Sequence, residues 1–129
     1  MIITQLHMDS DTPIYIQIAR KFKDDILTGR LNAGEKLPSI RALAKELRIS
    51  IITTMKAYEE LEKEGLVSAV QGKGFFVNAQ NTALIREQYQ RIMEKSLIAA
   101  LDAAQTGGIS ISELKTTLDT LIKLKEDFS

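Results

Sequence analysis

Two amphipathic segments, each headed by a serine that can cap a helix, lie only a short turn apart, and this arrangement constrains the fold more than any other feature. After Ser39 the expected buried face consists of Ile40, Leu43, Ala44 and Leu47. After Ser50 the expected inner face, which ends near Gly65, consists of Thr54, Ala57, Tyr58 and Leu61. Two helices joined by so short a turn predict a helix-turn-helix.

A β-hairpin is predicted directly after the second helix. Two β-prone runs, residues 66–70 and 75–77, flank a tip of Gln71, Gly72, Lys73 and Gly74, whose glycines tolerate positive φ. A hairpin in this position is a wing. An earlier amphipathic helix is expected to start at Thr12 as N-cap, with Pro13 at the first helical position, and to end near Gly29.

The C-terminal part of the chain carries two further helical stripes. The stretch 78–82 is polar, Gly107 and Gly108 separate the stripes, and Ser110 and Glu113 form a capping box. Two such helices cannot bury both stripes well, so they need each other, the winged part or a second copy of the chain. We expect a mainly α (α+β) fold with domains at 1–78 and 79–129. The residues assigned to dimerisation are Ile85, Tyr89, Ile92, Met93, Leu97, Leu114, Leu118 and Leu121.

Composition excludes several classes of protein. The chain has no cysteine, which removes disulfides and thiolate nucleophiles, and its single histidine, His7, has no partners at metal-ligand spacing. We therefore expect no enzyme activity, no metal and no cofactor. No run approaches eighteen uncharged apolar residues, and the leader MIITQLHMDSD lacks a basic stretch before an apolar run, so we expect a cytoplasmic protein without a membrane partner.

The charge is balanced overall but concentrated locally. Lys plus Arg and Asp plus Glu number 17 each, yet five basic residues between Lys36 and Lys56 face only Glu46, which leaves a local excess of four. Free N–H groups at the helix starts after Ser39 and Ser50 add anion affinity. The basic excess lies on the helix-turn-helix and predicts binding to double-stranded DNA.

Three motifs together resemble the GntR family of bacterial winged-helix transcription regulators. They are LPSIRALAKELRIS, AYEELEKEGLV and GKGFFV, and the likeness covers residues 13–78. The short two-helix tail is similar to that of the YtrA subfamily. The resemblance implies a homodimer that acts as a repressor and controls a transporter operon. The two-fold symmetry of such a dimer requires a palindromic operator.

The resemblance also implies roles for individual residues. Arg41 looks like the DNA-contacting arginine, Ser50 opens the recognition helix, and Thr53 and Lys56 lie on its exposed positions. The tip of the hairpin resembles the wing tip. Together with the charge and helix-end argument, the expected DNA-binding residues are Lys36, Ser39, Arg41, Ser50, Ile51, Ile52, Thr53, Lys56, Gln71, Gly72, Lys73 and Gly74.

Two positions depart from the family pattern. Ile51 and Ile52 stand where relatives usually carry an arginine or a polar residue. An isoleucine offers only apolar contact, for example to a thymine methyl group. Alternatively, at least one of the two covers the core or packs against the preceding helix.

Two questions stay open from the sequence. The winged helix could instead serve as a protein-interaction module that does not bind DNA, although the one-sided basic excess argues for DNA. A small-molecule effector of unidentified chemistry could bind between the tail helices or near the wing.

Overall fold

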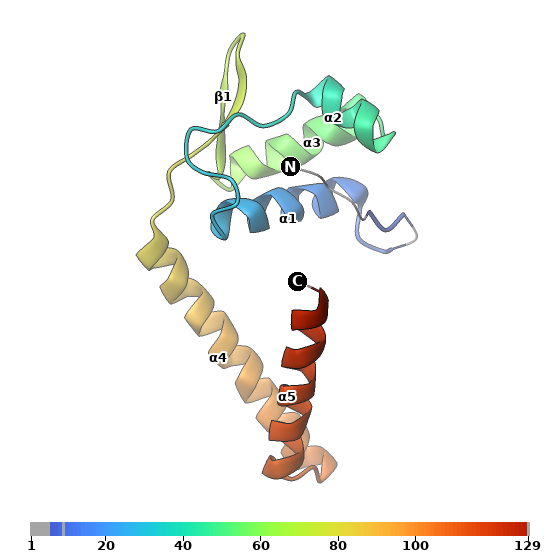
Figure 1. Ribbon diagram of the computed structural model, residues 1–129, viewed down its shortest axis with the longest axis vertical. Coiled ribbons are helices and arrows are strands. Elements are labelled where there is room, and N and C mark those ends of the chain that lie inside the picture. Colours follow the sequence, from blue (N-terminus) through green and yellow to red (C-terminus); the bar gives the residue numbers. More distant parts are fainter. Residues whose placement is uncertain (1–5, 9, 129) are drawn as a thin grey trace. The chain divides into compact units, whose positions relative to one another are not determined.

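The computed structural model describes residues 6–8 and 10–128, so most of the N-terminal leader lies outside the described residues. The chain divides between Thr82 and Ala83 into two compact units, called here the winged unit and the tail unit. The elements in chain order are α1 (Ile14–Leu27), α2 (Ile40–Leu47), α3 (Ile51–Lys63), β1 (Val67–Val70), β2 (Gly74–Val77), α4 (Thr82–Gly107) and α5 (Ile111–Phe128) (Figure 1). The predicted mainly helical winged fold is confirmed.

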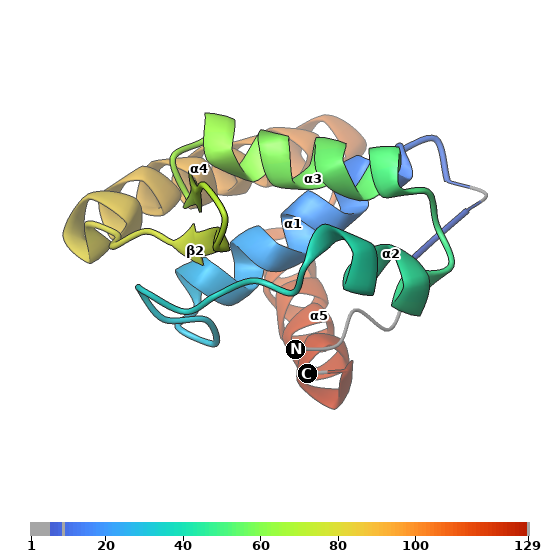
Figure 2. The ribbon, with the colours of Figure 1, turned by 90° about the horizontal axis from the view of Figure 1, so that it is seen from above.

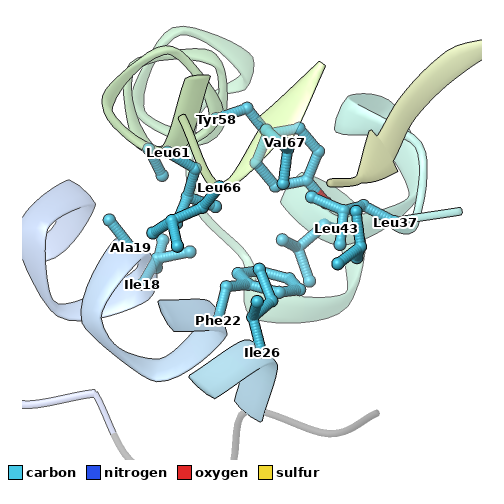
Figure 3. Close-up of a cluster of buried hydrophobic side chains, with 12 residues drawn as sticks. Ile18, Ala19, Phe22, Ile26, Leu37, Leu43, Tyr58, Leu61, Leu66 and Val67 are labelled. Carbon is cyan, nitrogen blue, oxygen red and sulfur yellow. The ribbon is translucent and has the colours of Figure 1, made fainter. Parts of the chain in front are cut away.

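The core of the winged unit forms around α3. Helices α1 and α2 and strand β1 all pack against it, and Figure 2 shows α2 and the hairpin toward opposite ends of α3. The largest fully buried side chains of this core are Tyr58, Phe22, Ile18, Leu37, Leu61 and Val67 (Figure 3). Because these residues come from four different segments, the core fixes the orientation of α3 relative to the rest of the unit.

Both predicted serine caps are present. The Ser39 hydroxyl accepts the Ala42 N–H at 3.1 Å, and the Ser50 hydroxyl accepts the Thr53 N–H at 2.9 Å. Between the two helices, Arg48 adopts a left-handed conformation with φ 56°. This conformation ends α2 abruptly and leaves room for the short turn that the sequence predicts.

The predicted cap of the first helix is wrong. α1 begins at Ile14, its cap residue is Pro13, and no side chain caps it. The side-chain amide of Gln17 instead donates to the Thr12 carbonyl at 2.9 Å. Proline fixes its own φ near the helical value, which lets the helix begin without a side-chain acceptor.

The hairpin has a shorter tip than predicted. Its antiparallel register runs from Val67 opposite Val77 to Val70 opposite Gly74, so Gly74 is the first residue of β2 and not part of the tip. Lys73 donates its N–H to the Val70 carbonyl at 2.9 Å. Gly74 has φ 117°, a conformation that side chains disfavour, and this lets the chain turn back after three residues.

A segment before α2 extends the small sheet, which the sequence did not indicate. The Leu37 N–H donates to the Phe75 carbonyl at 2.9 Å, and the Val77 N–H donates to the Glu35 carbonyl at 2.8 Å. Lys36 and Phe76 form an isolated bridge between them. The loop that leads into α2 is therefore fixed to the outer edge of the wing.

The tail unit consists of α4 and α5. Gly108, with φ 69°, separates them, and the predicted capping box is present. The Glu113 N–H donates to the Ser110 hydroxyl at 3.1 Å, and the Ser110 N–H donates to the Glu113 carboxylate at 2.9 Å. Figure 1 shows the two helices diverging from this turn. Among the described residues, no helix has the length and apolar character needed to cross a membrane.

Candidate nucleic-acid interface

The leading turn of α3 presents a pair of hydroxyl groups. Ser50 Oγ and Thr53 Oγ1 lie 2.7 Å apart, and the Ser50 oxygen also accepts the Thr53 N–H. One hydrogen bond between two hydroxyls uses one of their two protons. Whichever group donates, the other keeps a proton that can be donated to an acceptor outside the helix. After capping, this turn therefore still has one hydroxyl proton that can be donated in a hydrogen bond.

Apolar side chains project from the same turns of α3. Ile51 is 42% exposed and Ile52 is 64% exposed, and neither side chain belongs to the buried core cluster of the winged unit. Met55, one turn further, is 37% exposed. Met55 lies outside the inner face expected for this helix, and no motif in the sequence singled it out.

A groove lies between the start of α2 and the wing. It has a volume of about 410 Å³, and the segments 36–41 and 69–75 line it. Seven of the twelve predicted DNA-binding residues lie along it, namely Lys36, Ser39, Arg41, Gln71, Gly72, Lys73 and Gly74. The other five, Ser50, Ile51, Ile52, Thr53 and Lys56, lie on α3 or at its cap.

The basic side chains at this surface are not neutralised by ion pairs with described acidic side chains of the chain itself. Lys36, Arg41 and Lys73 are exposed, and within the described part of the chain none of them forms an ion pair. Lys56 lies 6.0 Å above the Tyr15 ring, a contact that orients its charge without cancelling it. The positive charge counted from the sequence is therefore available to an anionic partner.

Gly74 determines where Lys36 lies. A Cβ atom at position 74 would come within 3.0 Å of the Lys36 Cε, so the lysine stem fits against the wing because the glycine has no side chain. The bridge between Lys36 and Phe76 holds the backbone at the same place. A flexible side chain is thereby held beside the wing.

Tyr58 connects α3 to the loop that leads into α2. Its hydroxyl donates to the Pro38 carbonyl at 2.7 Å, directly before the Ser39 cap. Burial raises the pKa of the Tyr58 phenol far above its ordinary value, so the group stays protonated and continues to donate. This positioning contact between residues twenty apart gave no sequence signal.

The far end of α3 has the opposite charge. Glu64 pairs with Lys23 of α1 at 2.9 Å, and the Glu62 carboxylate accepts the Ala69 N–H at 3.3 Å. These acidic groups attach the end of α3 to α1 and the wing. The helix thus has a basic and hydroxyl-bearing leading end and an acidic far end, the polarity expected of a helix whose first turns approach phosphates. Within the described residues, no group of three acidic, histidine or cysteine side chains could hold a metal ion.

Comparison with known proteins agrees with this geometry. The family model described as "Bacterial regulatory proteins, gntR family" matches residues 14–77. The HTH-type transcriptional repressor YtrA of Bacillus subtilis (strain 168) is 32% identical over 110 residues, which cover 85% of this chain and 85% of that protein. This alignment is longer than the family match, so the likeness extends beyond the winged unit into the tail.

Solved structures show the same likeness. A GntR family transcriptional regulator from Listeria monocytogenes superposes with a TM-score of 0.68 at 26% identity, covering 88% of this chain and 98% of that one. AraR(DBD) in complex with operator ORE1 superposes with a TM-score of 0.50 at 28% identity, covering 60% of this chain and 94% of that one. A similar winged domain therefore has a solved structure on operator DNA.

Proposed function

Because the chain belongs to the gntR family of bacterial regulatory proteins and is a DNA-binding transcription regulator, we propose that it represses transcription as a homodimer on a palindromic operator. Membership of this family also makes it a regulator and not an enzyme. The observation that carries the proposal is the unneutralised basic surface shared by the groove and the start of α3. It provides the positive charge that operator phosphates require.

In the proposed complex the first turns of α3, residues 50–56, enter a major groove. Arg41 and Lys36 contact phosphates or base edges beside them, and the wing tip with Lys73 lies at the flanking minor groove. The free proton of the Ser50 and Thr53 pair is available to a phosphate oxygen. Lys56 follows one turn later on the same helix.

The tail supports the proposed homodimer. Among the apolar side chains described in the tail unit, only Ala104 is buried. All eight residues predicted for dimerisation are exposed or half-buried, namely Ile85, Tyr89, Ile92, Met93, Leu97, Leu114, Leu118 and Leu121. Contiguous apolar stripes of this size on two helices need a partner surface, and a second copy supplies the same stripes in a self-complementary way. Two-fold symmetry then requires a palindromic operator with half-sites about 10 bp apart or at a related spacing.

The proposals that the protein represses transcription and that its target is a transporter operon rest on its similarity to relatives. The B. subtilis relative is named a transcriptional repressor, which supports repression here. The resemblance to the YtrA subfamily supports a transporter operon as the target and the cytoplasm, where operator DNA resides, as the location. An apolar space of about 300 Å³ between α4 and α5, lined among others by Leu97, Leu114 and Leu118, is the candidate place for a small apolar effector.

A fluorescence-anisotropy titration with fragments of the gene's own promoter tests the proposal. We expect saturable binding whose affinity falls steeply as salt rises. Absent or salt-insensitive binding would favour the alternative, a protein-interaction module.

Arg41→Ala sharpens this test. The variant should lose about 1–3 kcal/mol of operator binding free energy if Arg41 reads a base. Lys63→Ala, at the far end of α3, is the matched control and should bind like the unmodified protein. Near-native affinity of Arg41→Ala would refute the role of Arg41.

A further inference from the structure

An exposed apolar patch occupies the leading turns of α3. Its members are Ile51, Ile52 and Met55, here called the isoleucine patch, and all three are substantially exposed. Met55 lies four residues after Ile51 and three after Ile52, so the three side chains are neighbours on the helix surface. Single exposed apolar residues need no explanation, but a contiguous patch at the presented end of a helix indicates a contact surface.

The surroundings of the patch identify the chemistry of its partner. Lys56 lies one turn beyond Ile52, and the hydroxyl pair of Ser50 and Thr53 adjoins Ile51. A partner that fits must therefore be polyanionic and must also present apolar groups between its charges. The major groove of duplex DNA meets both conditions, because the 5-methyl group of thymine is the apolar group exposed there.

We propose that the isoleucine patch recognises thymine methyl groups in each operator half-site, an inference that rests on the proposed DNA-binding function. Ile51, Ile52 and Met55 carry no hydrogen-bond donor for the acceptors of guanine, so apolar contact is what these positions contribute. The patch extends about 6 Å along the helix axis, which corresponds to roughly two base-pair steps. The operator therefore carries two neighbouring thymine-bearing pairs where α3 enters the groove.

Replacing thymine by deoxyuridine in the operator tests the inference directly. The exchange removes the 5-methyl group and keeps every hydrogen-bonding group of the base. Each contacted thymine that is replaced should weaken binding of the unmodified protein about fourfold, the effect of removing one buried methyl-sized group from the interface. Replacement of thymines outside the two contacted pairs should leave the affinity unchanged.

A variant comparison assigns the effect to these side chains. The double variant with Ile51→Ala and Ile52→Ala should bind the thymine and deoxyuridine operators with nearly equal affinity. Alanine favours the helix and both positions are exposed, so the variant should fold, which circular dichroism can verify. Ile98→Ala, an exposed isoleucine of α4, is the matched control and should keep the full deoxyuridine effect.

A second base exchange separates the methyl group from the rest of thymine. When a contacted T·A pair is changed to C·G, 5-methylcytosine at that position should bind the unmodified protein about fourfold more tightly than cytosine, and the double variant should not distinguish them. If the unmodified protein binds the fully deoxyuridine-substituted operator as tightly as the thymine operator, or if the double variant keeps the full difference, the inference is wrong while the proposed function stands. Failure to bind any promoter fragment would instead overturn the proposed function.

Discussion

At the scale of single residues, Tyr58 joins the core to the proposed interface. Its ring makes T-shaped contacts with Phe22 and Phe75, at centroid distances of 5.6 Å and 5.1 Å, and its hydroxyl bonds to the Pro38 carbonyl. One side chain thus holds α3, α1, the wing and the start of α2 together. Displacement of this ring would disturb every element that carries a proposed DNA-binding residue.

Tyr58→Phe should lower the free energy of unfolding by about 1 kcal/mol, because the Pro38 carbonyl loses its donor. The folded-state pKa of Tyr58 is raised, so its contribution to stability is complete below the unfolded pKa of about 10 and is lost as pH rises above it. Urea unfolding measured at pH 7 and above pH 10 should show that the variant loses less free energy of unfolding at alkaline pH than the unmodified protein does. Stability of Tyr58→Phe equal to that of the unmodified protein at both pH values would contradict the role of the hydroxyl.

A substitution of Lys73 tests whether the wing tip contacts phosphate. Lys73→Ala should reduce the slope of log affinity against log salt concentration by about one unit, because one phosphate contact and its released counterion are lost. The affinity for operator DNA and the affinity for unrelated DNA should fall by similar factors, since a phosphate contact carries no sequence information. An unchanged salt slope in anisotropy titrations would remove the wing tip from the phosphate contacts.

At the scale of elements, the first turn of α3 has two roles in the proposed complex, namely capping the helix and contacting DNA. The Ser50 hydroxyl caps the helix by accepting the Thr53 N–H, and it also shares a hydrogen bond with the Thr53 hydroxyl. In the proposed complex, helix stability and DNA contact therefore depend on the same side chain. Substitutions at position 50 can separate these roles, because an acceptor is sufficient for the cap whereas phosphate binding needs a donor or at least the absence of negative charge.

Ser50→Ala should lower the free energy of unfolding by about 1 kcal/mol, the usual cost of a lost N-cap. Ser50→Asp should preserve stability, because aspartate caps as well as serine and its charge suits the helix start. It should nevertheless weaken DNA binding, because the carboxylate repels phosphate. Thermal unfolding and anisotropy measured on both variants check this pair of outcomes, and unimpaired DNA binding by Ser50→Asp would place this turn away from the phosphates.

At the scale of the whole molecule, the two units differ in how well they bury apolar surface. The winged unit encloses a continuous core, whereas α5 has no buried side chain among those described and α4 has only Ala104. A helix pair with so little burial gains its stability mainly from a partner surface. In the proposed homodimer, the stability and DNA affinity of the protein would depend on its concentration.

Ile92→Glu and Leu121→Glu, each made alone, should convert the proposed dimer to a monomer, because a dimer interface would bury the new charge without a partner. Sedimentation analysis should show the change in mass. Affinity for the full palindrome should fall at least about 100-fold, toward that for a single half-site. Gln105→Glu, an exposed polar position of α4, is the matched control, and a variant that remains dimeric would place the interface elsewhere.

Local patterns along the chain were sufficient to predict the features that depend on neighbours within about four residues. Helical spacing located α2 and α3, and serine and glycine chemistry located both caps of the helix-turn-helix and the break before α5. The family motifs identified the class of protein for the same reason, since they record local turn and capping requirements. The wrong assignment of Thr12 shows the limit, because proline satisfied locally what a cap would otherwise supply.

Three-dimensional packing was needed to establish which side chains lie at the surface and which distant segments meet. It exposed Ile51, Ile52 and Met55 together, paired the Glu35 to Leu37 backbone with β2, and joined Tyr58 to Pro38. Each of these outcomes depends on how two helices and a hairpin pack around α3. Periodicity along the chain assigns a face to each residue, but burial is decided by what covers that face, and the covering segments are far away in sequence.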